Sequence, residues 1–384
     1  MSNNHFQVYS IIFISVIFLA CQTKSTNGSG SNLSFIGIDS SKFDSVISDK
    51  NVTLYHLVNK NGLTAIFTNY GARIVSLMVP DKESNPTDVV VGFNSINNYT
   101  TSSDPYYGAT IGRYGNRIAK GKFSIDGIDY QTPINDGLNM LHGGPIGYQG
   151  VIWNAEKIDS STIQFSYLSK DGEMGFPGNL NVKVTYRLRD DALKISYEAT
   201  TDKKTIINLT NHAYFNLNGE GSGTILNHQL EIFSDQYTPI DSTLIPTGEL
   251  ANVKGTPFDF TKPEIIGKRI DLDNDQLKHG KGYDHNFILK ENGDNKHAAH
   301  IIGDKSGIVM DVYTDQPGLQ FYCGNFMTGK NVFKGGAKDD FRTAFCLETQ
   351  HFPDSPNHPN FPSTELKAGE TMKSESYYKF SIKK

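Results

Sequence analysis

Cysteine, tryptophan and an excess of positive charge are all scarce or absent in this sequence of 384 residues. There are three cysteines and one tryptophan, and 41 Asp and Glu against 36 Lys and Arg give a net charge of −5. Proteins that bind nucleic acid usually carry a basic excess, so the charge argues against a nucleic-acid partner. The cysteines lack the paired spacing of zinc ligands, so the sequence predicts no metal site.

Glycine and aromatic residues are instead abundant, with 36 Gly, 19 Tyr and 23 Phe. Hydrophobic residues make up 37% of the chain, which is enough for a sizeable core and excludes global disorder. Long amphipathic helices and a strand–helix alternation are both missing from the pattern, which argues against a Rossmann or TIM fold. This composition favours strands joined by many turns.

The N-terminus begins with a stretch, residues 1–20, that has no Lys, Arg, Asp or Glu. Its apolar run from Val8 to Ala20 is shorter than the roughly 20 residues of a transmembrane helix and suits a secretory signal peptide. Cys21 follows Ala20 and precedes a polar segment, an arrangement that resembles a bacterial lipoprotein signal. We therefore expect a signal peptide over 1–20, and a lipidated Cys21 with a flexible tether over 21–48.

This interpretation predicts an exported protein, either periplasmic or anchored to the outer membrane of a bacterium, that touches a membrane only through its lipid. The alternative is a soluble secreted protein in which Cys21 has no role. The other two cysteines, Cys323 and Cys346, lie in expected strands. They either form a disulfide, which an exported compartment permits, or remain two buried thiols.

Strand patterns continue from about residue 50 to the C-terminus without an interdomain linker or a repeat. Asn61-Gly62 and Asp126-Gly127 each separate two short apolar runs, which predicts two β-hairpins. Further expected strands are 162–168, 182–188, 193–199, 308–314, 319–324 and 374–382. The simplest architecture is all-β: one large antiparallel β-sandwich domain over 49–384.

Six segments depart from ordinary strand and turn patterns and contain residues suited to chemistry. The first, 112–121, is rich in glycine and cations, but it lacks the ending of a phosphate-binding P-loop and could equally be a solvated turn. The second places His142 before two glycines, where a loop can approach a ligand closely. The third, 211–217, combines His, Tyr and Asn in an apolar segment, as a site or as a buried structural network.

The remaining three segments contain an acid or an amide. Asp284 lies between aromatic residues, either as a desolvated acid or in a capped turn, and Gln320 could bind a hydroxyl or face water from a strand. Glu348 follows an apolar run, where a charge is costly unless it is paired or used. A base candidate, Glu348, with acid candidates His212 and His142 points to acid–base chemistry on a small hydroxylated molecule.

At these residues the sequence resembles the aldose 1-epimerase, or galactose mutarotase, family from about residue 50 to 384. The matching segments are GRYGNRIAKGKF (112–123), LHGG (141–144), NLTNHAYFNL (208–217), YDHNF (283–287), GLQFYCGNF (318–326) and LETQHFPDSPNHPNFPS (347–363). The resemblance implies the family's large β-sandwich. It also implies an isomerase that interconverts the α and β anomers of free aldohexoses such as glucose and galactose.

By this resemblance Glu348 is the catalytic base and His212 the catalytic acid. The implied sugar-binding residues are Asn116, Arg117, His142, Tyr214, Asp284 and Gln320. No cofactor and no metal are implied, because the reaction changes no oxidation state and side chains can move both protons. Three alternatives remain open: a non-catalytic sugar-binding module, a glycoside hydrolase with Asp284 and Glu348 as its carboxylate pair, and a sugar-phosphate epimerase.

Overall fold

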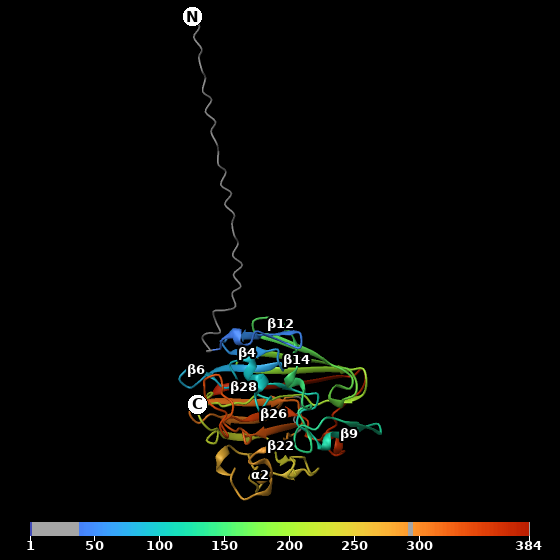
Figure 1. Ribbon diagram of the computed structural model, residues 1–384. Coiled ribbons are helices and arrows are strands. Elements are labelled where there is room, and N and C mark those ends of the chain that lie inside the picture. The colour runs from blue at the N-terminus through green and yellow to red at the C-terminus, as the bar shows by residue number, and fades with distance from the viewer. Residues whose placement is uncertain (2–37, 291–294, 384) are drawn as a thin grey trace.

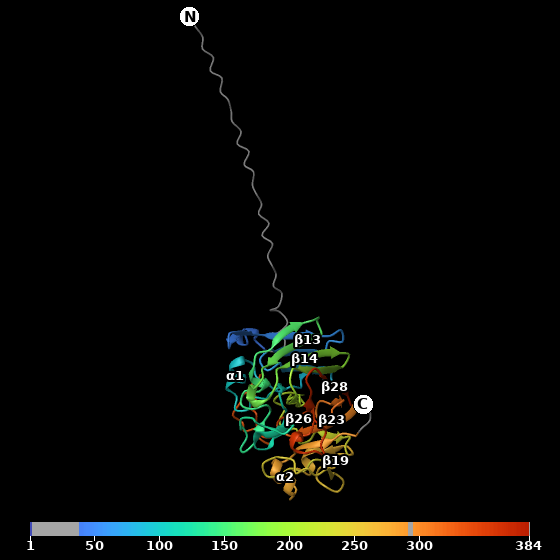
Figure 2. The same cartoon turned by 90° about the vertical axis from the view of Figure 1, so that its right-hand side faces the viewer.

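Strands are the main regular structure in the chain that a computed structural model describes, which is residues 38–290 and 295–383 together with Met1. They assemble into a β-sandwich, shown in two views in Figures 1 and 2. Within these residues the α-helices are α1 (Ile96–Thr101) and α2 (Asp275–Gly280), each of 6 residues. The prediction of an all-β antiparallel fold is therefore confirmed.

The larger layer is a nine-stranded sheet in which neighbouring strands run antiparallel. Two of its long strands, β14 (Leu180–Arg189) and β15 (Ala192–Thr201), alternate strictly between buried and less buried residues, so that Val182, Val184 and Tyr186 of β14 point into the core. Figure 2 labels β13, β14, β28 and β23 in this order from top to bottom. The strands in sheet order are β12 (Asn154–Lys157), β13 (Thr162–Ser169), β14 (Leu180–Arg189), β15 (Ala192–Thr201), β28 (Thr371–Ile382), β24 (Ile308–Thr314), β23 (Lys296–Ile302), β18 (Gln229–Ile232) and β21 (Glu264–Ile265).

Two smaller sheets share one apolar core with the nine-stranded sheet. Phe67 and Leu77 from the four-stranded sheet, and Phe287 and Phe321 from the five-stranded sheet, belong to the same buried cluster as Val184. The four-stranded sheet consists of β3 (Leu54–Val58), β4 (Thr64–Thr68), β5 (Arg73–Pro80) and β6 (Pro86–Asp88). The five-stranded sheet consists of β20 (Ala251–Asn252), β19 (Gln236–Tyr237), β22 (Asp284–Ile288), β25 (Gly318–Tyr322) and β26 (Cys346–Gln350).

Short strand pairs lie in the connections between the strands of the larger sheets. The pairs are β7 (Thr110–Ile111) with β17 (Thr210–Asn211), β8 (Arg117–Ile118) with β11 (Met140–Leu141), β9 (Lys122–Ile125) with β10 (Ile128–Gln131), and β16 (Thr205–Ile206) with β27 (Glu365–Leu366). They fix the positions of long loops whose own backbone is irregular.

Both hairpins predicted from Asn-Gly and Asp-Gly turns are present, as β3–β4 and β9–β10. Each remaining expected strand also overlaps an observed one. Cys323 and Cys346 are buried free thiols, which excludes the disulfide. No helix among the described residues is long and apolar enough to cross a membrane.

The segment just before the expected domain boundary packs against the sandwich. Ile38 and Phe43 are buried in an apolar cluster, and β1 (Ser45–Ile47) pairs with β2 (Lys50–Val52). The prediction of a flexible tether up to residue 48 is therefore wrong for 38–48, because these apolar side chains are removed from water. The predicted signal peptide, Cys21 and the tether over 21–37 lie outside the described residues.

Candidate active site

Three paired strands, β22, β25 and β26, form the floor of a cleft. Strand pairing sets Gln320 opposite Glu348, and Tyr322 opposite both Asp284 and Cys346. Residues that pair across a sheet, and residues two apart on a strand, point to the same face. The opposite face carries Leu319, Phe321 and Leu347 into the core. We use "floor" for Asp284, Gln320, Tyr322, Cys346 and Glu348.

Glu348 lies in the middle of β26 and is only 2% exposed. Its Oε2 atom is buried without a hydrogen-bond partner among the described residues. Burial, reinforced by the nearby charge of Asp284, raises the pKa of Glu348 well above its ordinary value of 4.5. A carboxylate held this way is a stronger base than one in water, and the structure excludes an exposed glutamate at a strand end.

Asp284 is the first residue of β22, in the same sheet as Glu348. It is buried and does not lie exposed in a turn. Gln320 Nε2 donates a hydrogen bond to Asp284 Oδ1 at 2.7 Å. Burial raises the pKa of Asp284, and this hydrogen bond opposes the rise. Gln320 is itself buried and is not among the residues that line the cleft. It stands on the same face of the sheet as Asp284 and orients that carboxylate, but unlike the other residues expected to bind the sugar it does not line the cleft.

The rim of the cleft comes from loops, and we use "rim" for Tyr106, Asn116, Arg117, His142 and His212. Asn116 lies just before β8 and His142 just after β11, and two hydrogen bonds join these two residues. The backbone N–H of Asn116 donates to His142 Nδ1 at 3.1 Å, and the backbone N–H of His142 donates to the Asn116 carbonyl at 2.9 Å. Both residues have a positive φ, 59° and 51°.

The hydrogen bond from Asn116 settles the tautomer of His142. A backbone N–H can only donate, so Nδ1 of His142 accepts and its single proton lies on Nε2. Burial is the main cause, and the nearby His212 the second, that lowers the pKa of His142 well below 6.5 and keeps the ring neutral. His142 lines the cleft with the other rim residues. Its side chain can therefore donate an N–H to a ligand oxygen.

His212 follows β17, and its backbone is hydrogen-bonded to the segment just before β7. Its N–H donates to the Ala109 carbonyl, and its carbonyl accepts from Gly108. His212 Nε2 lies 3.7 Å from Glu348 Oε1. Burial lowers the pKa of His212 to about 3, so the ring is neutral near neutral pH. A neutral acid candidate thus faces a buried base candidate across the cleft.

The two arginines of the 112–121 segment have different roles. Arg113 is buried and donates to the carbonyls of Pro177 and Gly178, which makes it structural. Arg117 lines the cleft and forms an ion pair through Nε with Asp136 Oδ2 at 2.8 Å. This pair fixes a positive charge beside the two buried acids, and the charge lowers the pKa of both.

Tyr106 is a rim residue that the sequence analysis missed. Its ring centroid lies 4.6 Å from that of His142 and 5.7 Å from that of His212. Arg73, which is fully buried, holds the backbone on both sides of Tyr106 by donating to the carbonyls of Tyr70, Pro105, Tyr107 and Gln149. The Asp-Pro-Tyr-Tyr sequence at 104–107 was a signal that could have indicated it.

Tyr214 lines the cleft, but its hydroxyl donates to Asp104 Oδ2. Its ring centroid lies 4.9 Å from that of His212. The side chain therefore supports His212 through ring packing, and its hydroxyl is occupied. Asp104 was not predicted, since its partner is 110 residues away in the sequence.

Gly143, which follows His142, is required by close packing. Its φ is +83°, and a Cβ atom there would lie 2.0 Å from the carbonyl oxygen of Gly112. A residue with a side chain cannot occupy this position without moving the loop. The glycine therefore lets the His142 loop pack directly on the 112–121 segment.

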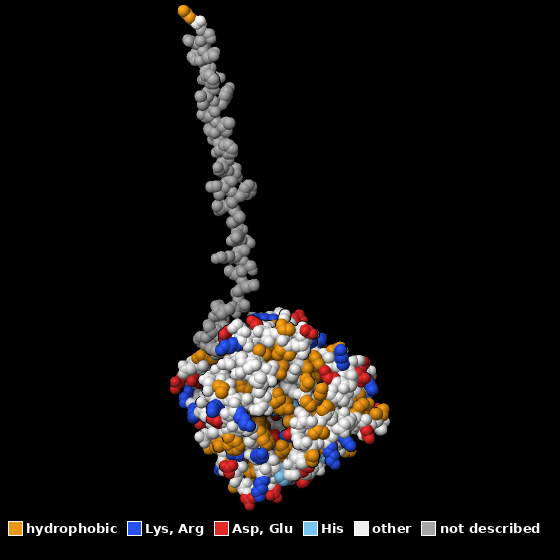
Figure 3. Space-filling model, in the orientation of Figure 1, with side chains coloured by type: hydrophobic (Ala, Val, Ile, Leu, Met, Phe, Trp, Pro, Cys, Tyr) orange, Lys and Arg blue, Asp and Glu red, His pale blue; other side chains and the backbone are white. Residues whose placement is uncertain are grey.

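Floor and rim enclose an open cleft of about 610 Å³. Figure 3 shows a hollow in the face of the molecule near the position of β26 in Figure 1. Seven of the eight predicted catalytic and binding residues line it: Asn116, Arg117, His142, His212, Tyr214, Asp284 and Glu348. The six sequence segments, which are far apart in the chain, therefore converge on one site.

The side chains of His142, His212 and Glu348 come within 4.8 Å of one another, a spacing compatible with a metal ion. The donor chemistry of His142 argues against this reading. Its Nδ1 lone pair is used by Asn116, so the Nε2 atom carries a proton and has no lone pair to offer. The cluster is better suited to exchanging protons with a ligand than to holding a cation.

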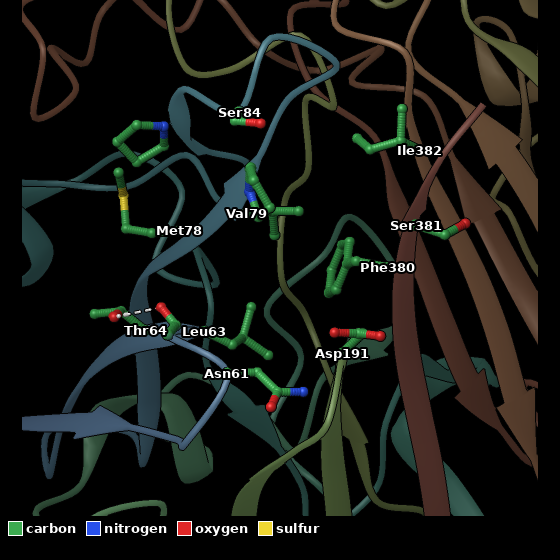
Figure 4. A pocket seen from close by; sticks show the side chains of 13 residues that line it. Asn61, Leu63, Thr64, Met78, Val79, Ser84, Asp191, Phe380, Ser381 and Ile382 are labelled. Atoms are coloured by element: carbon green, nitrogen blue, oxygen red, sulfur yellow. Dashed lines mark hydrogen bonds between the residues drawn. The ribbon is translucent and has the colours of Figure 1, made fainter. Parts of the chain in front are cut away.

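A second pocket, of about 430 Å³, lies beside the turn between β5 and β6 and the end of β28 (Figure 4). Its walls are mainly apolar, with Leu63, Val79, Phe380 and Ile382, and Asp191 is its single carboxylate. It lacks an acid–base pair. The candidate active site is therefore the polar cleft.

The cleft, with a buried base, a neutral histidine and several hydrogen-bond donors, defines an enzyme that moves protons on a small hydroxylated molecule. Comparisons with known proteins agree. The family model "Aldose 1-epimerase" matches residues 53–379. Galactose mutarotase of Rattus norvegicus is 45% identical over 314 residues, which are 82% of this chain and 90% of that protein. Aldose 1-epimerase of Escherichia coli (strain K12) is 39% identical over 331 residues, 85% and 94% of the two chains.

Solved structures give the same result. The GalM/aldose epimerase homologue from C. elegans is 30% identical, with a TM-score of 0.80, and covers 87% of this chain and 100% of that one. Galactose 1-epimerase from Lactobacillus acidophilus is 28% identical, with a TM-score of 0.78, and the match covers 88% and 97%. The chain belongs to the aldose 1-epimerase family. It is an isomerase with mutarotase function.

Proposed function

We propose that this enzyme interconverts the α and β anomers of free aldohexoses such as glucose and galactose, with Glu348 as base and His212 as acid. The observation that carries this proposal is the buried pair itself, with Nε2 of His212 at 3.7 Å from Oε1 of Glu348. A pair this close can act on two oxygens bonded to the same carbon, as in the hemiacetal of a sugar.

The reaction begins when Glu348 removes the proton from the anomeric hydroxyl and neutral His212 gives its Nε2 proton to the ring oxygen. The negative charge passes from Glu348 to the His212 ring until ring closure returns the proton. The bond between the anomeric carbon and the ring oxygen breaks, and a free aldehyde forms. Rotation about the adjacent carbon–carbon bond exposes the other face of the aldehyde. Ring closure then reverses both proton transfers and gives the other anomer. Each positioned transfer typically contributes ~10² to 10⁴ in rate.

The other side chains bind the sugar and stabilise charge. His142 donates its Nε2–H, and Arg117 places a positive charge, where an oxygen gains negative charge as the ring opens. Asp284, oriented by Gln320, accepts a hydrogen bond from a sugar hydroxyl. Asn116 contributes an amide at the same rim, beside the loop that holds His142.

The direct test is polarimetry of freshly dissolved α-galactose and α-glucose with the purified enzyme. We expect the approach to the equilibrium rotation to accelerate in proportion to enzyme concentration. A rate equal to that of buffer for both sugars, and for other aldoses, would overturn the proposal. Binding of these sugars without acceleration would instead indicate a sugar-binding module.

We further propose that the enzyme is exported and held at a bacterial membrane by a lipid on Cys21. The support is the apolar run up to Ala20 followed directly by Cys21. The full-length protein should partition into detergent, and its mature N-terminus should have the mass of a lipidated Cys21. The variant Cys21→Ser should remain in the aqueous phase. An unmodified Cys21, or a retained segment 1–20, would contradict the lipid anchor.

A further inference from the structure

Cys346 is a buried residue next to the catalytic pair that the mechanism above does not use. It lies two residues before Glu348 on β26, points to the same face of the sheet, and has no exposed surface. Its Sγ atom lies 3.5 Å from Nδ1 of His212. His212 therefore has one neighbour from β26 at each ring nitrogen, the thiol at Nδ1 and the carboxylate at Nε2.

The proposed reaction requires the proton of neutral His212 to be on Nε2, because only Nε2 faces Glu348 and the cleft. A neutral imidazole has one N–H and one lone pair, and the group at Nδ1 decides which nitrogen has the proton. Asn116 makes this choice for His142 through a backbone N–H. At His212 the corresponding neighbour is a thiol.

A thiol is a weak donor and a still poorer acceptor, so it favours a lone pair on Nδ1. Burial raises the pKa of Cys346 well above its ordinary value of 9, and the thiol therefore keeps its proton. The opposite tautomer would set the lone pair of Nε2 against the carboxylate oxygen of Glu348, two acceptors 3.7 Å apart. Both contacts of the ring favour a proton on Nε2.

Among the described residues the thiol is the hydrogen-bond contact of Nδ1, so its removal leaves the choice of tautomer to Glu348 alone. We therefore expect the tautomer of His212 to depend on residue 346.

We propose that Cys346 is a positioning residue that donates its S–H to Nδ1 of His212 and thereby holds the catalytic proton on Nε2. This inference rests on the proposed role of His212 as the acid. It assigns no contact between Cys346 and the sugar, so it predicts an effect on turnover and not on sugar binding.

The first test compares Cys346→Ser with Cys346→Ala by mutarotation kinetics. A serine hydroxyl can still donate to Nδ1, whereas alanine cannot. We expect Cys346→Ala to lower kcat about tenfold, the scale of one lost hydrogen bond, with KM changed less than about twofold. Cys346→Ser should retain kcat within about threefold. If packing alone mattered, the polar serine would be no better than alanine in this apolar position, and that ranking would overturn the proposal.

Cys323→Ala is the matched control. Cys323 is the other buried free thiol, but it belongs to the core cluster behind the sheet, and its Sγ atom lies near the Tyr283 carbonyl. This variant removes the same atom at a similar depth without touching His212. We expect kcat and KM to stay within about twofold of wild type, as for a substitution outside the site.

The second test reads the tautomer directly by ¹⁵N NMR of histidine side chains in the full chain. The His212 signals are identified by their loss in His212→Asn. Wild type and Cys346→Ser should show the proton on Nε2, and Cys346→Ala should move it partly to Nδ1. A proton on Nδ1 in wild type would overturn the inference even if no variant folds. Since this measurement needs no sugar, an enzyme without mutarotase activity would refute the proposed function separately.

Discussion

Floor and rim of the cleft obtain their side chains in different ways. Asp284 and Glu348 on the floor stand on regular, paired strands whose other face is part of the core. Asn116 and His142 on the rim stand on loops with positive φ, and are fixed by hydrogen bonds to each other. The floor supplies acceptors and the base, and the rim supplies donors and the acid. The rigid sheet therefore holds the groups whose burial is most costly, while the loops shape what faces them.

The largest expected effect tests whether floor and rim act as one unit. Glu348→Gln and His212→Asn should each lower kcat by at least ~10²-fold, because each removes one positioned proton transfer. The double variant should lose little more than the worse single variant, since neither half works alone. Polarimetry on α-galactose measures all three. Glu83→Gln, at an exposed glutamate, is the control and should match wild type. If the double variant lost kcat by the product of the two single losses, floor and rim would act independently.

The next effect is the pH dependence of the floor. Burial raises the pKa of Glu348 above its ordinary value of 4.5. The base works only when deprotonated, so kcat/KM should be full above this pKa and fall about tenfold per pH unit below it. A pH profile of kcat/KM should place this acid limb clearly above 4.5. A limb at 4.5 or lower would mean that Glu348 is solvated in the working enzyme.

A third prediction perturbs the rim through its backbone. Gly143→Ala adds a Cβ atom 2.0 Å from the Gly112 carbonyl, whereas Gly127→Ala in the β9–β10 turn meets nothing within 4 Å. The two glycines have similar φ angles, +83° and +78°. Gly127→Ala should cost about 1 kcal/mol of unfolding free energy, and Gly143→Ala about 3 kcal/mol, with a loss of kcat. Urea unfolding and polarimetry measure both. If both variants lost the same unfolding free energy, the rim loop would be able to move away from the added Cβ atom at little cost.

The smallest effect concerns how much the buried carboxylate of Glu348, on the floor, lowers the free energy of unfolding. The folded state holds the proton of Glu348 more tightly than the unfolded chain does, so ionisation of this residue opposes folding. Stability should therefore fall as pH rises from 4.5 to the raised pKa of Glu348. Glu348→Gln removes this dependence and should be more stable by on the order of 1 kcal/mol above that range. Urea unfolding across pH tests it, and a less stable variant at alkaline pH would contradict the prediction.

The floor was more accessible to sequence reasoning than the rim. Strand patterns predicted the strand around Gln320 and put Glu348 at the end of an apolar run. Glu348 in fact lies in the middle of β26, and its depth depends on the loops that cover it. On the rim, His142 and His212 were acid candidates from the residues themselves. Asn116 and Arg117 were identified as site residues only through the family resemblance, because no local pattern brings residues 116, 142 and 212 together. Tyr106 and Asp104 were missed for the same reason. Their partners are distant in the sequence and are chosen by the fold.

Arg73 has a consequence for the timing of catalysis. Its guanidinium fastens carbonyls on both sides of Tyr106 to the sandwich, so the wall beside both histidines belongs to the same rigid body as the core. A cleft built in this way is already open and already arranged when a sugar arrives. We therefore expect no lid to close before the ring opens. Sugars enter and leave by diffusion, as suits an enzyme whose substrate and product differ only in the configuration of one carbon.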